Sequence, residues 1–341
     1  MTAIRYTPNC VNRQEKVKRV LAVGEVNMDI VFTGLTNLPR AEQDTLAQSL
    51  DIMVGGQTAT IARAMARLGM DVAFVGRVGD DDYGRTCVRA LRDAGINTAG
   101  LVVDPSLRTG ATVVLSAGTE RAFATYLGSI CAVRRSDVTP ELFGSADHMH
   151  VGSFYLQTTL RPHMLDLFRA AKGRGLTTST DPGWDQLREW GHDLLDVLRY
   201  VDVFLPNEVE ALEMTRASGP EAALGILAER ARVVVIKMGG RGCLVRGGTQ
   251  TIRCPAFQVP VVDVTSAGDI FNAGFLHGFL HGWDLVDSVK FANACGAISV
   301  SKAGNIGMPD VAGVEAFLVA HAGELAIQAG PEFTTKTPRH Q

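Results

Sequence analysis

Short apolar runs alternate with longer helical patterns along most of the chain. Residues 58–69, "TATIARAMARLG", carry apolar side chains at helical spacing and end at a glycine, and residues 71–79, "DVAFVGRVG", follow as a strand. The same alternation returns in the helical pattern of 221–231 and the apolar run of 232–240. Strands that alternate with helices predict an α/β fold with a mostly parallel central sheet and helices on both faces. Ligands of such sheets bind outside the carboxyl ends of the strands.

Two segments break this alternation. Residues 29–54 and about 98–132 contain strand-like pieces with no helical pattern between them. We therefore expect a small separate β-sheet beside the main one, placed as a lid over a pocket. The main domain is expected over residues 18–322, after a polar lead-in at 1–17 and before a polar tail at 323–341.

Composition excludes several classes of protein. The net charge of −3 gives no basic face for nucleic acid or for an anionic membrane surface. No run of about 18 uncharged apolar residues is present, so a membrane span is not expected. The amino-terminal residues lack the apolar core of a secretory signal, and the six cysteines form no CxxC pair. These features favour a cytoplasmic protein.

The run "DVTSAGDIF" (263–271) is the strongest candidate for chemistry. Three small residues, Ser266, Ala267 and Gly268, stand directly before Asp269 and an apolar helical pattern. Small residues let a backbone approach a ligand closely, and the N–H groups at a helix start can bind an anion. Asp269 beside them could accept a proton from a substrate hydroxyl. The alternative is an ordinary acid in a first helical turn, stabilised by the helix dipole.

Three further clusters have both a functional and a structural interpretation. Gly55-Gly56 precedes a helical pattern and would allow a ligand close to the backbone, or simply make a tight strand-to-helix turn. Asn207 and Glu210 stand three apart, as in a ligand pair or as in an N-cap with its partner. Lys237 ends an apolar run, where a lysine commonly is just solvated. The usual P-loop and GxGxxG motifs are both missing.

The order and spacing of these motifs resemble the ribokinase-like sugar kinases, also called the PfkB family. The resemblance covers about residues 18–320. Its two signatures correspond to "GGQTATIARAMARLG…VGRVGDDDYG" and to "DVTSAGDIFNAGFLHG", and the second is the more specific. Asp181-Pro182, "PNEVEA" and "KMGGRG" follow between them in the expected order. The resemblance implies a ribokinase-like fold with a small β-sheet lid.

Site roles follow from the resemblance position by position. Asp269 becomes the base, and Ser266, Ala267 and Gly268 form an anion hole. Residues matching sugar-binding positions are Asn27, Asp29, Gly55, Gly56, Gln57 and Thr60. Residues matching nucleotide-binding positions are Asn207, Lys237, Gly239, Gly242 and Asn293, with Lys237 facing the phosphates and Asn293 the adenine. Glu210 with Asn207 helps hold Mg²⁺ largely through water, and Asp263 and Thr265 match ligands of a monovalent cation, often K⁺.

The chain also departs from the family pattern at identifiable positions. Ser266 and Thr60 stand where the family often has Gly and Asn, and Gly183 where it usually has Asn. The loop "SKAGNIGMPD" lacks the small hydroxyl residue that some members carry near Met308. Activation by K⁺ is therefore an open expectation.

These features together predict an ATP-dependent kinase for a hydroxyl of a small sugar, such as a ketohexose, a pentose or a sugar acid. A homodimer through the lid is expected. One alternative is a nucleoside kinase, because "RAFATYLGS" resembles a lid strand of adenosine kinases. Its stacking residues would be Phe123, Tyr126, Phe154 and Tyr155, for which core packing is the simpler role. A second alternative is a non-catalytic sugar-sensing protein of the same fold.

Overall fold

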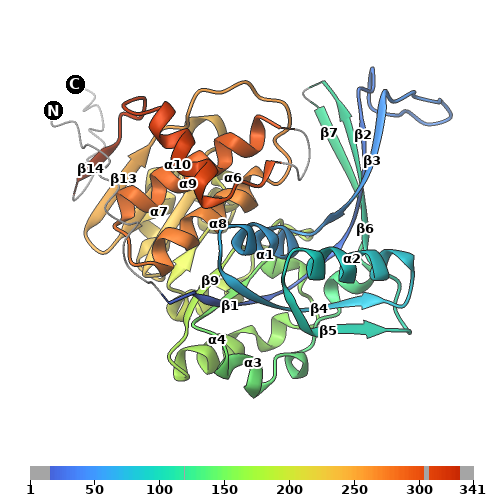
Figure 1. The fold of residues 1–341 in the computed structure, drawn as a ribbon, viewed down its shortest axis with the longest axis horizontal. Helices are drawn as coiled ribbons and strands as arrows, with labels where there is room; N and C mark the ends of the chain where they lie inside the picture. The colour runs from blue at the N-terminus through green and yellow to red at the C-terminus, as the bar shows by residue number, and fades with distance from the viewer. Residues whose placement is uncertain (1–15, 119, 303–306, 331–341) are drawn as a thin grey trace.

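Two β-sheets organise the molecule (Figure 1), and the computed structural model describes residues 16–118, 120–302 and 307–330. The larger sheet contains β1 (Arg19–Val23), β4 (Asp71–Gly79), β5 (Asn97–Asp104), β8 (His148–Val151), β9 (Thr177–Thr180), β10 (Val203–Phe204), β11 (Val233–Lys237), β12 (Cys243–Gly247), β13 (Gln250–Cys254) and β14 (Gln328–Gly330). The smaller sheet contains β2 (Asn27–Thr33), β3 (Ser49–Gly55), β6 (Ala111–Ala117) and β7 (Glu120–Tyr126). The helices are α1 (Gln57–Arg67), α2 (Asp82–Asp93), α3 (Pro140–Gly144), α4 (Met164–Gly173), α5 (His192–Val197), α6 (Glu208–Thr215), α7 (Pro220–Ala228), α8 (Ala267–Leu280), α9 (Leu285–Val300) and α10 (Val311–Ala320).

The larger sheet has the order β14-β13-β12-β11-β10-β9-β8-β1-β4-β5. From β11 to β5 all neighbours pair in parallel, and β12, β13 and β14 continue the sheet antiparallel. Successive residues of β1 enter two different cores: Val20 and Ala22 pack beneath α1 and α8, whereas Leu21 and Val23 pack on the opposite side with α4. Both faces are buried, which is why strands such as β1 and β11 carry apolar side chains on both faces and do not alternate. The predicted α/β class is confirmed.

Helix α1 shows how local sequence sets an element boundary. The chain leaves β3 and turns at Gly56, whose φ of 94° is a conformation that favours glycine. Ile61 and Met65, one helical turn apart, then bury completely in the core. The helix ends before Gly69, which has a φ of 87° and closes it as expected from the sequence.

The smaller sheet, in the order β3-β2-β6-β7, rises beside α1 and α2 in Figure 1. The expected lid boundaries need a correction, because residues 98–104 belong to β5 and pair with β4 in the larger sheet. The expected tail needs another, because β14 pairs with β13 inside the region taken as tail. Both errors arise from strand pairing between distant segments, which local pattern does not reveal. The lead-in up to residue 15 and residues 331–341 lie outside the described residues.

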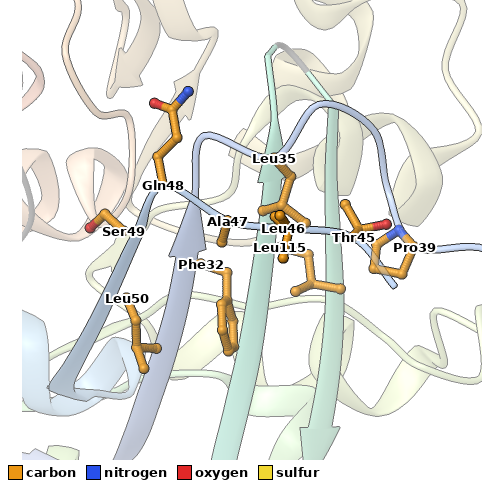
Figure 2. A pocket seen from close by; sticks show the side chains of 10 residues that line it. All are labelled: Phe32, Leu35, Pro39, Thr45, Leu46, Ala47, Gln48, Ser49, Leu50 and Leu115. Carbon is orange, nitrogen blue, oxygen red and sulfur yellow. The ribbon is translucent and has the colours of Figure 1, made fainter. Parts of the chain in front are cut away.

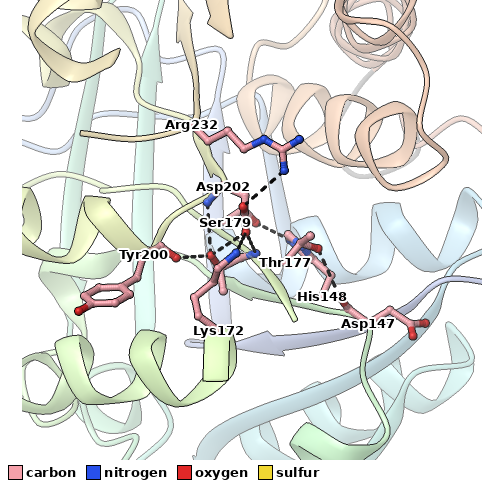
Figure 3. Close-up of polar contacts among 9 residues, drawn as sticks. Asp147, His148, Lys172, Thr177, Ser179, Tyr200, Asp202 and Arg232 are labelled. Atoms are coloured by element: carbon pink, nitrogen blue, oxygen red, sulfur yellow. Dashed lines mark hydrogen bonds and ion pairs between the residues drawn. The ribbon is translucent and has the colours of Figure 1, made fainter. Parts of the chain in front are cut away.

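The central strands also carry buried polar side chains, shown in Figure 3. His148 Nδ1 lies 2.9 Å from Thr177 Oγ1, and His148 Nε2 lies 2.7 Å from Ser179 Oγ. The Lys172 ammonium donates to Asp202 at 2.7 Å. Because His148, Thr177 and Ser179 hydrogen-bond one another, their polar groups are satisfied between the strands. Burial also lowers the pKa of His148 to about 3.

The sequence led us to expect no membrane span and contains no CxxC pair among its cysteines, and the described residues bear on both points. No helix there is long and apolar enough to cross a membrane. The five cysteines in the described ranges are free thiols, and four of them are buried.

Candidate active site

A pocket of about 530 Å³ opens at the carboxyl edge of the larger sheet. It brings together side chains and backbone from α6, β11, α8 and α9, which are far apart in the sequence. The candidate residues that line it are Gln57, Asn207, Glu210, Lys237, Gly239, Gly242, Ser266, Ala267, Gly268, Asp269 and Asn293. Its apolar wall includes Phe257, Val259 and Phe271. The location agrees with the rule for ligands of parallel sheets.

Neighbouring strands explain the polar end of this pocket. Lys237 is the last residue of β11, Asp181 follows β9, and β10 lies between these two strands. The Lys237 Nζ donates to Asp181 Oδ2 at 2.6 Å, and the Asn272 amide of α8 donates to the same oxygen at 2.7 Å. Gly183 N donates to the other carboxylate oxygen at 3.0 Å. Lys237 is therefore a buried ion-pair partner, and the simple solvated interpretation is wrong.

This ion pair sets the ionisation of both partners. Burial opposes the charge on Asp181, but the Lys237 charge and the hydrogen bonds from Lys237, Gly183 and Asn272 together outweigh it and hold the pKa of Asp181 below its ordinary value. Burial likewise disfavours the Lys237 charge, while Asp181 and Glu210 raise its pKa. In the sequence, Asp181 was noted only as part of the Asp181-Pro182 motif and received no role in the site. Its position directly after a buried strand was the available signal.

Asn207 and Glu210 form the capping box of α6. The Asn207 Oδ1 accepts from Glu210 N at 2.9 Å, and the Glu210 Oε2 accepts from Asn207 N at 2.8 Å. The structural alternative is thus observed, yet both residues also line the pocket. Burial, and then the Asp181 charge, raise the pKa of Glu210 to about 7. A buried carboxyl of this kind would ionise more readily beside a cation.

The start of α8 presents backbone N–H groups to the pocket. Ser266, the N-cap, has a left-handed φ of 61°, the conformation that the usual glycine would adopt easily. Among the described residues, the N–H groups of Ser266 and Gly268 donate to no protein acceptor. Ala267 N, in contrast, donates to Val264 O at 3.3 Å, so of the three residues expected to form the anion hole only Ser266 and Gly268 present an N–H without an acceptor among the described residues.

Asp269 lies in the first turn of α8, next to these N–H groups. Burial raises its pKa well above the ordinary value, and the charges of Asp181, Glu25 and Glu210 raise it further. Lys237 acts in the opposite direction. A carboxylate with a raised pKa binds a proton more strongly, as a general base must.

The expected sugar-binding residues gather at the junction of β2, β3 and α1, and of these only Gln57 lines the pocket. Asn27 Nδ2 donates to Asp29 Oδ1 at 2.8 Å. A Cβ at Gly55 would collide with the Asp29 carboxylate, and one at Gly56 would approach Asn27 Oδ1. The two glycines therefore make the tight turn and also leave room for these side chains. Thr60 is buried inside α1.

Glu25, at the end of the β1 region, was missed by the sequence reasoning. Its buried carboxylate accepts from Thr58 Oγ1 at 2.8 Å, Ser153 Oγ at 2.7 Å and Gln157 Nε2 at 2.9 Å. Burial raises the pKa of Glu25. Burial also raises the pKa of Asp29 to about 6; the Asn27 hydrogen bond opposes this shift and the Glu25 charge adds to it. Glu25 and Asp29 thus make this side of the site acidic.

The nucleotide-side candidates line the opposite part of the pocket. Gly242 has a φ of 86°, and a Cβ there would collide with the carbonyl of Cys254. Asn293 Nδ2 lies 3.1 Å from Cys254 Sγ, which orients its side chain at the pocket wall. Gly239 is also left-handed, with a φ of 57°.

The two expected cation ligands contact a side chain that the sequence did not suggest. Arg121 of β7 donates to Asp263 Oδ1 and to Thr265 Oγ1, each at 3.2 Å. Part of the loop "SKAGNIGMPD", residues 303–306, lies outside the described residues.

The aromatic side chains considered for a nucleoside divide into two groups. Phe154 and Tyr155 belong to a hydrophobic core, as their simpler interpretation predicted. Phe123 and Tyr126 lie exposed on β7.

The parallel sheet, the small second sheet and the pocket at the strand ends define a ribokinase-like protein. The chain matches the model of the pfkB family carbohydrate kinases over residues 17–311. It belongs to this family and is a carbohydrate kinase, which confirms the resemblance drawn from its motifs.

Curated relatives match over nearly their whole length. An ATP-dependent ribose-1-phosphate kinase from Halopiger xanaduensis is 31% identical over 302 residues, which cover 88% of this chain and 98% of that protein. Fructokinase-1 from Zea mays is 31% identical over 305 residues, which cover 84% of this chain and 93% of that protein.

Solved structures share the fold. A fructokinase with bound ATP from Xylella fastidiosa superposes with a TM-score of 0.77 at 24% identity, covering 89% of this chain and 98% of that one. Arabidopsis thaliana ribokinase complexed with ribose and ATP gives a TM-score of 0.76 at 22% identity, covering 89% and 99%. At these identities the likeness concerns the fold.

Proposed function

We propose that this kinase transfers the γ-phosphoryl group of ATP to a hydroxyl of a small neutral sugar. The observation that carries the proposal is the meeting of Asp269, the N–H groups of Ser266 and Gly268, and Lys237 in one pocket. A base, an oxyanion site and a phosphate-facing cation are what phosphoryl transfer requires, because it depends on position and charge neutralisation.

Asp269 acts as the base in this reaction. It accepts the proton of the acceptor hydroxyl while that oxygen bonds to the γ-phosphorus and the bond to the β-phosphate oxygen breaks, releasing ADP. The Ser266 and Gly268 N–H groups donate to the oxygens of the transferring group. Lys237 adds positive charge at the phosphates while remaining anchored by Asp181.

Mg²⁺ fits Glu210 as a water-mediated partner. The described residues contain no cluster of three or more His, Cys, Asp or Glu side chains that could hold a metal. We therefore propose that water and ATP supply most of the Mg²⁺ ligands. One Glu210 oxygen is engaged in the capping box, and a nearby cation would relieve the cost of ionising this buried carboxyl. Bound Mg²⁺ would neutralise phosphate charge. Asn207 holds Glu210 in place.

The acceptor side favours a neutral sugar. The Asp29 carboxyl suits hydroxyl groups as hydrogen-bond donors, and its negative form would repel carboxylates and phosphates. Ketohexoses and pentoses therefore rank above sugar acids. Several curated relatives are named fructokinases, which supports a ketohexose.

We further propose the smaller sheet as the lid, contributed by residues 29–54 and 111–126, within a kinase domain that extends to β14. Closing it would exclude water from the transfer. A cytoplasmic setting suits the free thiols.

The outer face of this sheet is a candidate homodimer interface. By register, Phe32 lies between Leu50 and Leu115, and these side chains line a groove of about 520 Å³ (Figure 2). Leu50 and Ile52 lie on the same face and are 53% and 56% exposed. Leu50→Glu should convert a dimer to a monomer in light scattering. Asp51→Lys, which changes an exposed charge on the other face of β3 and outside the lining of the groove, serves as the control; a monomeric wild type would contradict the proposal.

An acceptor panel tests the function. Purified protein, ATP and Mg²⁺ are incubated with fructose, ribose, a sugar acid, ribose 1-phosphate or adenosine, and the phosphorylated product is measured by mass spectrometry. We expect the highest kcat/KM with a neutral sugar. Preference for adenosine would support the nucleoside kinase, and no transfer to any acceptor would support a non-catalytic sensor; either result contradicts the proposal.

A further inference from the structure

A guanidinium from the smaller sheet contacts the two residues that were expected to bind a monovalent cation. Arg121 lies on β7, and its side chain is 29% exposed; that of Asp263 is 22% exposed. Its two donors reach Asp263 Oδ1 and Thr265 Oγ1, each at 3.2 Å. These two residues are the ones that the family resemblance assigned to K⁺. The contacts join segments 142 and 144 positions apart in the chain.

The contacted loop runs directly into the proposed anion hole. Asp263 Oδ1 also accepts from Thr265 N at 2.8 Å, which closes a turn one residue before Ser266. Val262 N donates to Val300 O at 2.7 Å and ties the loop to the end of α9. Asp263 N also donates to Val300 O, at 3.2 Å, so Val300 holds the backbone of Asp263 while Arg121 holds its side chain and that of Thr265. A change in this turn would move the left-handed Ser266 and its N–H group.

The chemistry of arginine suits this position. A guanidinium stays charged at any working pH and offers several donors in a fixed plane, so it can bridge a carboxylate and a hydroxyl together. It supplies a full positive charge beside a loop whose N–H groups receive a phosphoryl group. A K⁺ that bound through the side chains of Asp263 and Thr265 would have to compete with the guanidinium for them.

We propose that Arg121 is a positioning residue that replaces the monovalent cation, so that this kinase works without K⁺. The proposal rests on the anion-hole role given to Ser266 and Gly268. Arg121 acts through Asp263 and Thr265, which keep the turn in the shape that presents those N–H groups. Its location on β7 makes the smaller sheet contribute to the geometry of the catalytic loop.

The test compares variants at constant ionic strength, with KCl exchanged for tetramethylammonium chloride. Arg121→Gln removes the charge, Arg121→Lys keeps it, and Arg40→Gln removes an exposed arginine from the loop between β2 and β3 as the matched control. We expect wild type and Arg40→Gln to keep the same rate in both salts. Arg121→Gln should be roughly tenfold slower in tetramethylammonium chloride, less than the ~10²–10³ lost with a direct oxyanion donor, and should recover in KCl. Arg121→Lys should stay near wild type.

Melting curves give a second readout that needs no substrate. KCl should raise the melting temperature of Arg121→Gln by about 2 °C over tetramethylammonium chloride and leave wild type unchanged. Activation of wild type by K⁺, a loss in Arg121→Gln that K⁺ does not restore, or an equal loss in Arg121→Lys would each overturn the proposal. Failure of the proposed kinase function is distinguishable, because it would abolish transfer in wild type while the melting curves still report the cation.

Discussion

The Lys237 ammonium and the Asp181 carboxylate face each other at 2.6 Å across the end of β10, with Asp181 fully buried and Lys237 nearly so. Breaking a buried ion pair leaves one uncompensated charge. Asp181→Asn should therefore lower the free energy of unfolding by about 3 kcal/mol in urea denaturation. The double variant Asp181→Asn/Lys237→Met removes both charges and should recover part of this loss. A double variant less stable than Asp181→Asn would contradict the assignment.

Ser266 provides a test of local strain. A left-handed conformation costs a non-glycine residue about 1–2 kcal/mol, and glycine returns part of that through its greater freedom in the unfolded chain. Ser266→Gly should raise the free energy of unfolding by up to about 1 kcal/mol and keep transferase activity, since the backbone N–H remains. Ser266→Ala, which keeps a Cβ, is the control. A Ser266→Gly protein that melts below wild type would refute the strain argument.

Glu210 should control the dependence on magnesium. Glu210→Gln keeps an acceptor for the capping box but loses the carboxylate charge. The Mg²⁺ concentration for half-maximal rate should rise, and excess metal should partly restore activity. If Glu210 only caps α6, the Mg²⁺ midpoint will be the same in wild type and variant.

The same variant predicts a pH effect on stability. The native pKa of Glu210 is about 7 against an ordinary 4.5, so between these values the folded state holds a proton that the unfolded state has released. The stabilisation is complete below about pH 4.5 and is lost as the pH rises through 7. Relative to Glu210→Gln, wild type should lose on the order of 2 kcal/mol between pH 5 and 8 in denaturation experiments. A constant difference across this range would show that Glu210 does not titrate there.

The local sequence pattern was enough to predict several features of this structure. The end of α1 at Gly69 and the acid after the small residues of α8 could be predicted because neighbours in sequence determine them. For Asn207 and Glu210 the sequence offered both a capping box and a ligand pair; the capping box is observed, and both residues line the pocket. Asp181 and Glu25 could not be assigned, because their burial depends on strands that pair across the sheet.

Contacts between distant segments account for the errors in the boundaries of the lid and of the main domain. The joining of β5 to β4 and of β14 to β13 depends on tertiary pairing, which sequence periodicity does not encode. In the sequence, nothing distinguishes Arg121 from an ordinary surface arginine. Its proposed role follows from its contact with Asp263, which is 142 positions away.

The most direct test of the account is the kcat of Asp269→Asn with the preferred sugar, ATP and Mg²⁺. The side chains are nearly equal in size, so folding and ATP binding should persist, which melting curves and nucleotide titration can verify. We predict that kcat falls by at least ~10², because the proton of the acceptor hydroxyl loses its positioned base. A folded, ATP-binding Asp269→Asn protein that turns over at a rate near wild type would contradict the central claim.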